Sequence, residues 1–209
     1  PHRHFVDFEF TTKTNGAKTM QFQLSAWRPG RYELANFSQN IQKWAAFDEN
    51  NNPLPFKKIT KDLWEVDTNG TMEITVTYNF YANQLDAGAC YLDEHQLYLN
   101  PVHCMFYIVD RMEEDYKIAL DIPKNYKIAS SMELEGNTLS VKGYDLLAES
   151  PLICSDSLQH GTYEVDGITF HLWFQGGCKP DWEKLNKDFT AFTKSQINNF
   201  GGFPVDEYH

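Results

Sequence analysis

Short runs of alternating apolar and polar residues recur along the chain up to residue 174 of its 209 residues. Between them lie turn signals, such as Asn-Gly, Asp-Gly and Gly-Asn, at fairly regular intervals. Alternation with a period of two places every second side chain on one face of a strand. The pattern therefore predicts a mostly β chain, an antiparallel β-sandwich or saddle-like domain, and argues against repeated βαβ units.

Three turn signals each lie between two alternating runs and predict a hairpin. The strongest is Asn69–Gly70, because Asn-Gly accepts the two positive φ values of a type I′ turn. The predicted pairs are residues 4–11 with 19–24 about Asn15–Gly16, 63–66 with 72–80 about Asn69–Gly70, and 163–165 with 168–174 about Asp166–Gly167. Further strands are expected at 37–47, 97–99, 105–109, 116–122, 126–134 and 138–141.

The periodicity changes after Gly176–Gly177, where apolar residues fall on one stripe of a helix. Asp181 can cap the start of this helix, and Gly201 can end it. We therefore expect a helix over about 181–200, after a β-sandwich domain at 1–157 and a hairpin at about 162–175 in a second unit, 158–209. The stripe consists of Trp182, Leu185, Phe189, Phe192, Ile197 and Phe200.

The charge balance narrows the classes of partner. With 18 Lys and Arg against 29 Asp and Glu, the formal net charge is −11, which argues against nucleic-acid binding. No apolar run approaches the roughly 20 residues that span a bilayer. The chain begins at Pro1, so the sequence leaves the compartment open between cytoplasm and periplasm.

No complete catalytic or metal-binding constellation is found in the sequence. H-E-x-x-H and G-x-S-x-G are both absent. His2 and His4 share one face of a strand and form at most a weak metal pair. His103 is expected to be a satisfied structural histidine beside the thiol of Cys104, and Asp93–His95 a solvated loop. We therefore predict no catalytic residue and no metal ligand in this chain.

The four cysteines show no C-x-x-C spacing, which argues against a zinc knuckle or a redox pair. Buried free thiols are the expected state, and one disulfide stays open as an alternative. The four are Cys90, Cys104, Cys154 and Cys178.

The candidate functional segment is the loop Trp27-Arg28-Pro29-Gly30-Arg31-Tyr32. Pro29 and Gly30 predict a type II turn, since Pro fixes φ near −65° and Gly permits positive φ. The loop is either a structural connection or a rigid element that presents groups to a substrate or a neighbouring domain. In the second interpretation, Trp27 and Tyr32 anchor the loop, while Arg28 and Arg31 make the contacts.

Four stretches follow one another in a recognisable order: Trp27–Tyr32, Pro123–Ala129, Tyr144–Leu152, and Phe200–Pro204 with Tyr208. Together they resemble landmarks of the glycyl aminopeptidase family of zinc metallopeptidases, gluzincins that often carry a C-terminal PDZ domain. Two positions depart from the family pattern, with Tyr126 where Trp is usual and Glu149 where Asp is usual.

The resemblance implies that the β-sandwich is followed by the first hairpin and helix of a truncated thermolysin-like α+β catalytic domain. Zinc would be bound in the missing part of that domain, and none in this chain. The implied partners are the chain's own catalytic domain and a peptide substrate with N-terminal Gly or Ala. A different hypothesis is an independent peptide- or glycan-binding module that uses Trp27, Tyr32, Trp44 and Trp64.

The stripe of the predicted helix provides a structural test. If it normally packs on a missing domain, Trp182, Phe189, Phe192 and Phe200 should be incompletely covered. Exposed apolar patches of that kind promote association. We therefore expect partial self-association, or a disordered tail after about Gly176.

Overall fold

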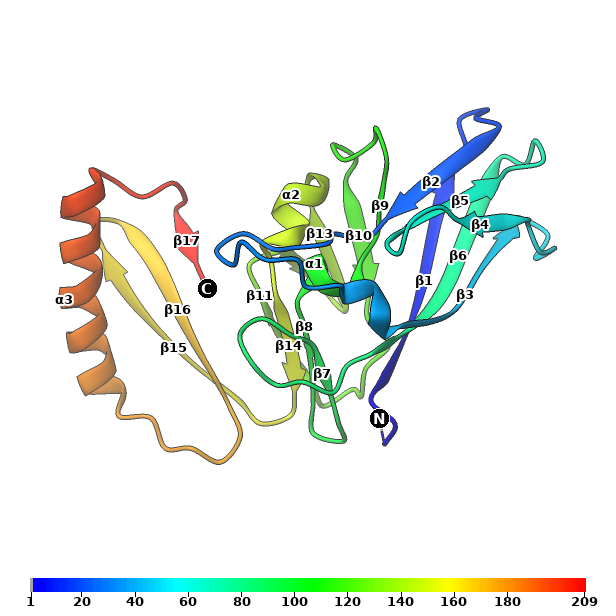
Figure 1. Ribbon diagram of the computed structural model, residues 1–209. Coiled ribbons are helices and arrows are strands. Elements are labelled where there is room, and N and C mark those ends of the chain that lie inside the picture. Colours follow the sequence, from blue (N-terminus) through cyan, green and yellow to red (C-terminus); the bar gives the residue numbers. More distant parts are fainter. Residues whose placement is uncertain (1) are drawn as a thin grey trace.

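The computed structural model describes residues 2–209 and consists mainly of antiparallel β-sheets, as the sequence predicts (Figure 1). Between the described strands, the pairing of β16 with β17 is the one parallel pairing. The elements are β1 (Phe5–Lys13), β2 (Thr19–Gln23), η1 (Phe37–Asn40), β3 (Ile41–Asp48), β4 (Phe56–Lys58), β5 (Leu63–Asp67), β6 (Glu73–Tyr81), β7 (Tyr91–Leu92), β8 (Gln96–Leu99), α1 (Pro101–Cys104), β9 (Tyr107–Ile108), β10 (Tyr116–Ala119), β11 (Lys127–Ser130), β12 (Glu133–Glu135), β13 (Thr138–Val141), α2 (Gly143–Ala148), β14 (Leu152–Ser155), β15 (Leu158–Val165), β16 (Ile168–Gln175), α3 (Trp182–Phe200) and β17 (Glu207–Tyr208).

Two predicted hairpins are wrong, although their turns form. Asn15–Gly16 and Asn69–Gly70 have the expected positive φ values, yet β1 pairs with β6 and β2 pairs with β5. The strand pair β1–β6 bends at these turns and continues as β2–β5 in another sheet (upper right in Figure 1). Buried Thr14 and Thr68 hold the bend, since their amides donate to the carbonyls of Met72 (2.9 Å) and Lys18 (3.0 Å).

These turns therefore connect two sheets of the sandwich. One sheet has the strand order β1-β6-β3, and the other has the order β4-β5-β2-β9. Their facing side chains form one core cluster, in which Phe106 meets Trp64 and Tyr78 edge-on, with ring centroids 5.1 and 4.9 Å apart. Burial of large aromatic rings stabilises this half of the chain.

A second core cluster lies under the sheets β10-β13-β12 and β11-β14-β8-β7. Two short helices, which the sequence did not predict, cover it. Pro101 begins α1 at a position that needs no amide hydrogen, and Tyr144 of α2 is buried. The hairpin β12–β13 forms about Gly136, which has a positive φ.

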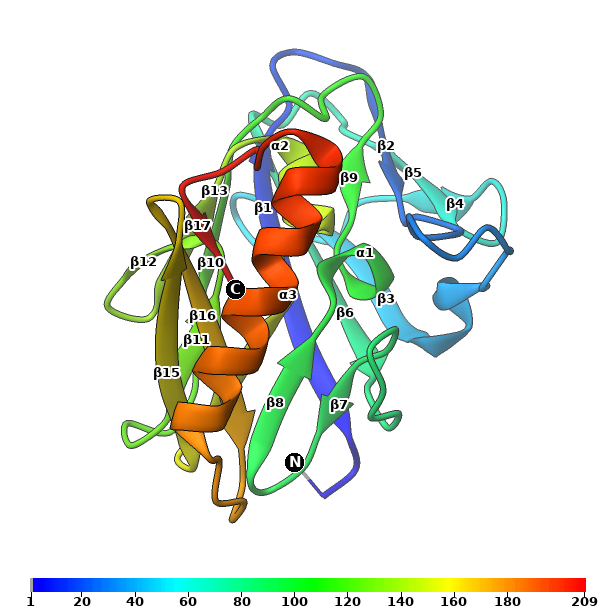
Figure 2. The same cartoon turned by 90° about the vertical axis from the view of Figure 1, so that its left-hand side faces the viewer.

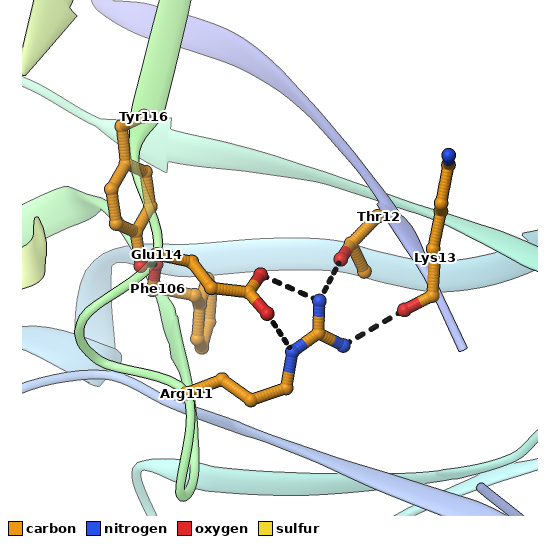
Figure 3. A network of polar contacts seen from close by, with 6 residues as sticks. All are labelled: Thr12, Lys13, Phe106, Arg111, Glu114 and Tyr116. Atoms are coloured by element: carbon orange, nitrogen blue, oxygen red, sulfur yellow. Dashed lines mark hydrogen bonds and ion pairs between the residues drawn. The ribbon is translucent and has the colours of Figure 1, made fainter. Parts of the chain in front are cut away.

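Arg111 ties the segment between β9 and β10 to the end of β1 (Figure 3). Its guanidinium donates two hydrogen bonds to the carboxylate of Glu114, at 2.7 and 2.6 Å. It also donates to the carbonyl of Lys13 (2.8 Å) and to the hydroxyl of Thr12 (3.1 Å). The bidentate pair lowers the pKa of Glu114, so the network is held in its charged form at neutral pH.

The third layer consists of β15, β16 and β17, with α3 on its outer face (Figures 1 and 2). Here the sequence predictions are confirmed: β15 and β16 pair about Asp166–Gly167, and α3 begins after Asp181 and ends at Gly201. The Asp181 carboxylate accepts the amide of Lys184 at 3.1 Å, as an N-cap does. The predicted division between residues 157 and 158 falls between β14 and β15 and stays a prediction.

The apolar stripe of α3 is only partly covered, as predicted. Phe192 is 61% exposed and Phe200 is 82% exposed, while Trp182 packs edge-on against Phe174 and lies over Gly161. The segment after Gly176 folds as α3 and β17 rather than as a disordered tail.

Candidate functional site

The candidate loop leaves β2 at a fixed point. Leu24 is fully buried, and the hydroxyls of Ser25 and Tyr144 are 3.1 Å apart. The amide of Ala35 donates to the carbonyl of Ala26 at 2.9 Å and closes the base of the loop. Because Tyr144 is itself buried on α2, the loop is held at its base by the second core cluster.

The tip of the loop is the predicted turn. The amide of Arg31 donates to the carbonyl of Arg28 at 3.3 Å, and Gly30 has φ +80°. With Pro29 before Gly30, this is the geometry of a type II turn. The sequence therefore predicted the backbone of the tip correctly.

The predicted anchoring role of the two aromatic side chains is wrong. Trp27 is 47% exposed and Tyr32 is 89% exposed, so neither anchors the loop in a core. Their rings lie near each other at the tip, with centroids 6.2 Å apart. Arg28 is half-buried and lies so close over Gly88 that a Cβ there would be 2.6 Å from its guanidinium. The guanidinium of Arg31 pairs with Glu33 at 2.6 Å.

A cavity of about 350 Å³, here called the loop cavity, opens beside the loop. The two arginines and the segment around Gly88 form part of its lining. Its inner wall includes side chains that sequence analysis treated as structural. The lining includes Arg28, Arg31, Phe37, Gly88, Cys90 and His103.

His103 is not the satisfied histidine that the sequence predicted. It is only 3% exposed, yet its Nε2 has no hydrogen-bond partner among the described residues. The imidazole stacks on Phe37, with ring centroids 3.9 Å apart. An unpartnered buried nitrogen is costly, so the wall of this cavity is not optimised for packing alone.

Two thiols lie beside this imidazole. A hydrogen bond from Cys104 is the main cause that lowers the pKa of Cys90 to about 6; His103 and the amide of Asn100 add to it, while burial opposes it. Burial raises the pKa of Cys104, which therefore stays a thiol. Spacing could not reveal this cluster, because Cys90 and Cys104 are fourteen positions apart in the chain.

The other sequence candidates separate in the structure. His2 contacts the carboxylate of Glu94, whereas Nδ1 of His4 contacts the carbonyl of Leu92, so the two histidines do not form a pair. The Asp93 carboxylate accepts the amides of His95 (2.8 Å) and Gln96 (2.9 Å). Glu94 and His95 are exposed, which confirms the predicted solvated loop.

The cysteines largely follow the prediction. All four are free, and Cys90, Cys104 and Cys154 are buried, but Cys178 is exposed.

One cluster in the part of the chain that the structure describes has the composition of a metal site. The ligand atoms of His171, Glu207 and His209 all lie within 4.8 Å of one another. However, Trp173 Nε1 donates to Nδ1 of His209 at 3.2 Å, and Glu207 and His209 are exposed. The three residues come from strands and the chain end, so they lack the helical spacing of H-E-x-x-H.

A known protein family accounts for most of the chain. The family model for the Peptidase M61 N-terminal domain matches residues 1–156. The chain belongs to this family. It thus contains the N-terminal domain of an M61 peptidase, and no curated protein matches it.

A solved structure extends the likeness in fold. The crystal structure of an aminopeptidase N family protein from Idiomarina loihiensis matches with a TM-score of 0.89 at 24% identity. The match covers 99% of this chain and 36% of that chain. The M61 chain therefore spans about a third of the length of this relative. Within residues 2–209, no helix has the length and hydropathy of a membrane span.

Proposed function

We propose that this chain is the non-catalytic N-terminal part of a zinc-dependent aminopeptidase that removes N-terminal Gly or Ala from peptides. Its support is the M61 N-terminal domain match over residues 1–156, together with the order of the glycyl aminopeptidase landmarks. Its partner is its own catalytic domain, which would hold the zinc that activates water for peptide hydrolysis. The sequence has no H-E-x-x-H, so this chain contributes no zinc ligand from such a motif.

The structure of the Trp27–Tyr32 loop supports a role for this chain in shaping the substrate cleft of the full-length enzyme. Its base is hydrogen-bonded to a core, whereas the two aromatic rings at its tip are exposed. In Figure 1, the loop points toward the part of the molecule that contains β15–β17 and α3. In the turned view of Figure 2, the loop does not lie behind these elements but next to them in the picture. An exposed apolar tip on a rigid base is suited to packing against a neighbouring domain.

In this proposal, the loop provides two kinds of contact. Trp27 and Tyr32 pack on the catalytic domain. Arg28 and Arg31 offer guanidinium donors to carbonyl or carboxylate groups of a bound peptide, at the rim of the loop cavity.

The test uses the full-length protein with peptides that begin with Gly or Ala. Arg28→Ala and Arg31→Ala should each raise KM about tenfold by removing charge-assisted hydrogen bonds. Trp27→Ala with Tyr32→Ala should loosen domain packing, measured by limited proteolysis between the domains. Arg3→Ala, on the N-terminal segment, is the matched control. If none of the loop variants differs from this control, the loop is only a turn.

A second experiment tests the assignment of catalysis. The present chain with added zinc should not cleave Gly- or Ala-initiated peptides, and the longer protein should cleave them. Hydrolysis by the short chain alone would contradict the proposal.

The alternative is an independent peptide- or glycan-binding module. Trp64 is buried and Trp44 packs against the same core, which leaves only Trp27 and Tyr32 of the four proposed aromatics for a ligand. Titration of the isolated chain with peptides and sugars, followed by tryptophan fluorescence, separates the two proposals. Specific micromolar binding would favour the module.

A further inference from the structure

The inner wall of the loop cavity holds groups that the proposed peptidase role does not use. The wall contains the thiol of Cys90, before β7, and the imidazole of His103 of α1, and a second thiol, that of Cys104 of α1, is fully buried and does not line the cavity. All three side chains are buried, and His103 and Cys90 line the cavity. The cavity therefore gives a small reagent a route to a sulfur atom that is otherwise covered.

Both sulfur atoms contact the backbone of Asn100. The amide of Asn100 donates to Sγ of Cys90 at 3.4 Å. The carbonyl oxygen of the same residue lies 3.7 Å from Sγ of Cys90 and 3.5 Å from Sγ of Cys104. Both sulfur atoms thus lie within 3.7 Å of one carbonyl oxygen, that of the residue before α1.

The surroundings favour negative charge on Cys90. The Asn100 amide donates to its sulfur at 3.4 Å. The Cys104 thiol, followed by His103 and this amide, lowers the pKa of Cys90 to about 6, although burial opposes the shift. Arg28 lines the same cavity, and so do Arg31 and Glu33, which pair with each other at 2.6 Å. A thiolate with nearby positive charge and solvent access is the reactive form of cysteine. Cys154 is the contrast, since burial raises its pKa to about 12.

We propose that Cys90 and Cys104 form a redox pair, in which Cys90 reacts with a small hydroperoxide that enters through the loop cavity and Cys104 then closes a disulfide with it. Cys90 is the attacking residue because it lines the cavity, and Cys104 is the resolving residue because it is fully buried. Nε2 of His103, which has no hydrogen-bond partner among the described residues, provides the polar site that the reagent enters, and His103 lines the same cavity as Cys90.

The chemistry balances in two steps. The Cys90 thiolate attacks the terminal oxygen of the hydroperoxide; an S–O bond forms, the O–O bond breaks, and the leaving alkoxide takes up a proton to become an alcohol. Cys104 then attacks the sulfenic sulfur; the S–S bond forms, and the departing hydroxide combines with the Cys104 proton as water. Two thiols lose two electrons, and one hydroperoxide gains them.

The first experiment uses the chain as a Cys178→Ser variant, which removes the exposed thiol. Treatment with equimolar hydrogen peroxide, followed by peptide mapping in a mass spectrometer, should show a Cys90–Cys104 disulfide with a loss of two hydrogens. Cys154 should stay reduced, and Cys90 should react at least ~10-fold faster than it does. A Cys90 no more reactive than Cys154 would overturn the proposal.

A second variant separates the two roles. Cys104→Ser should stop the reaction at the sulfenic acid of Cys90, which dimedone then labels, whereas Cys90→Ser should leave Cys104 unmodified. Circular dichroism checks that both variants fold; if either fails, the disulfide map of the first experiment still decides. A labelled Cys104 in the Cys90→Ser variant, or an oxidised Cys90 without a disulfide in the parent, would contradict the assigned pair.

Discussion

Residues 2–155 and residues 158–209 use the same kinds of strand but differ in how much of their apolar surface they cover. The first region buries two core clusters of thirteen residues each, whereas the second has a cluster of three buried residues. On α3, Thr193 is the one buried residue among those described. Its hydroxyl and that of Tyr163 are 2.9 Å apart and share a hydrogen bond.

The difference has a physical reason. In the first region, side chains from two sheets share each core cluster, so both sheets of a pair bury an apolar face. In the second, one three-stranded sheet has only α3 on one face, and the aromatic stripe of α3 extends beyond it. The first region should therefore be stable by itself, and the second should gain stability from any surface that covers it.

The largest expected effect is at the centre of the first region. Phe106→Ala removes a buried ring that contacts Trp64 and Tyr78 and should lower the free energy of unfolding by about 3–5 kcal/mol. Urea unfolding followed by circular dichroism measures this. A loss below about 1 kcal/mol is what an exposed position would give. It would contradict the statement that the first region is better packed than the second.

A smaller effect is expected where α3 meets its sheet. Gly161→Ala places a Cβ 2.4 Å from the ring of Trp182, so the ring must shift, and we expect a loss of about 1–3 kcal/mol. Gly177→Ala is the matched control, since nothing lies within 4 Å of its Cβ. Thermal unfolding of both variants should separate them, and equal melting temperatures would show that α3 is not docked through Gly161.

Acid should weaken the second region selectively, by less than Gly161→Ala does. Burial, followed by the charge of His171, lowers the pKa of His160 and of His209 in the folded state. Both rings are neutral above a pH of about 6.5. Below it, the unfolded chain binds protons first, so the stability of the layer falls as the pH is lowered.

Hydrogen exchange resolved by peptide tests the pH effect. Peptides from β15 and β16 should lose protection between pH 7 and pH 5, while peptides from β1 and β6 should not, after correction for intrinsic exchange rates. The variant His160→Gln should flatten the response. Uniform loss of protection in both regions would show that acid acts on the fold as a whole.

The smallest effect on stability is expected on the exposed stripe. Phe192→Ser should change the free energy of unfolding by no more than about 0.5 kcal/mol, because the ring is 61% exposed. It should instead reduce self-association, measured by sedimentation at increasing concentration. Both Phe106→Ala and Phe192→Ser remove a phenyl ring. The first should lower the stability of the fold, whereas the second should leave stability almost unchanged and reduce self-association. A monomeric parent chain at all concentrations would contradict the predicted self-association.

Local features followed directly from the sequence. The Pro29–Gly30 turn, the Asp166–Gly167 hairpin and the helix from Trp182 to Phe200 form as predicted. Each depends on backbone preferences or on the periodicity of neighbouring residues, which act within a few positions of the chain. The same preferences gave the correct backbone at Asn69–Gly70 but the wrong strand pairing.

The candidate site was predicted only in part. The loop could be located because Trp, Pro, Gly and Arg together are unusual between two strands. The roles of its side chains could not be assigned, since exposure depends on what the rest of the fold places nearby. Gly88, which lies under Arg28, carries no signal of its own in the sequence. Tyr144 begins one of the family landmarks, but nothing in the sequence links it to the base of the loop.

The sequence alone therefore determined the fold class, the local turns, the last helix and the family resemblance. Only the tertiary structure decided that the two Asn-Gly turns pass between sheets, that Trp27 and Tyr32 are exposed, and that two distant thiols meet beside His103. The physical reason is that strand pairing and side-chain burial depend on contacts between residues far apart in the chain. A turn residue selects its own φ and ψ values, but the neighbours of a strand are selected by the core that both must cover.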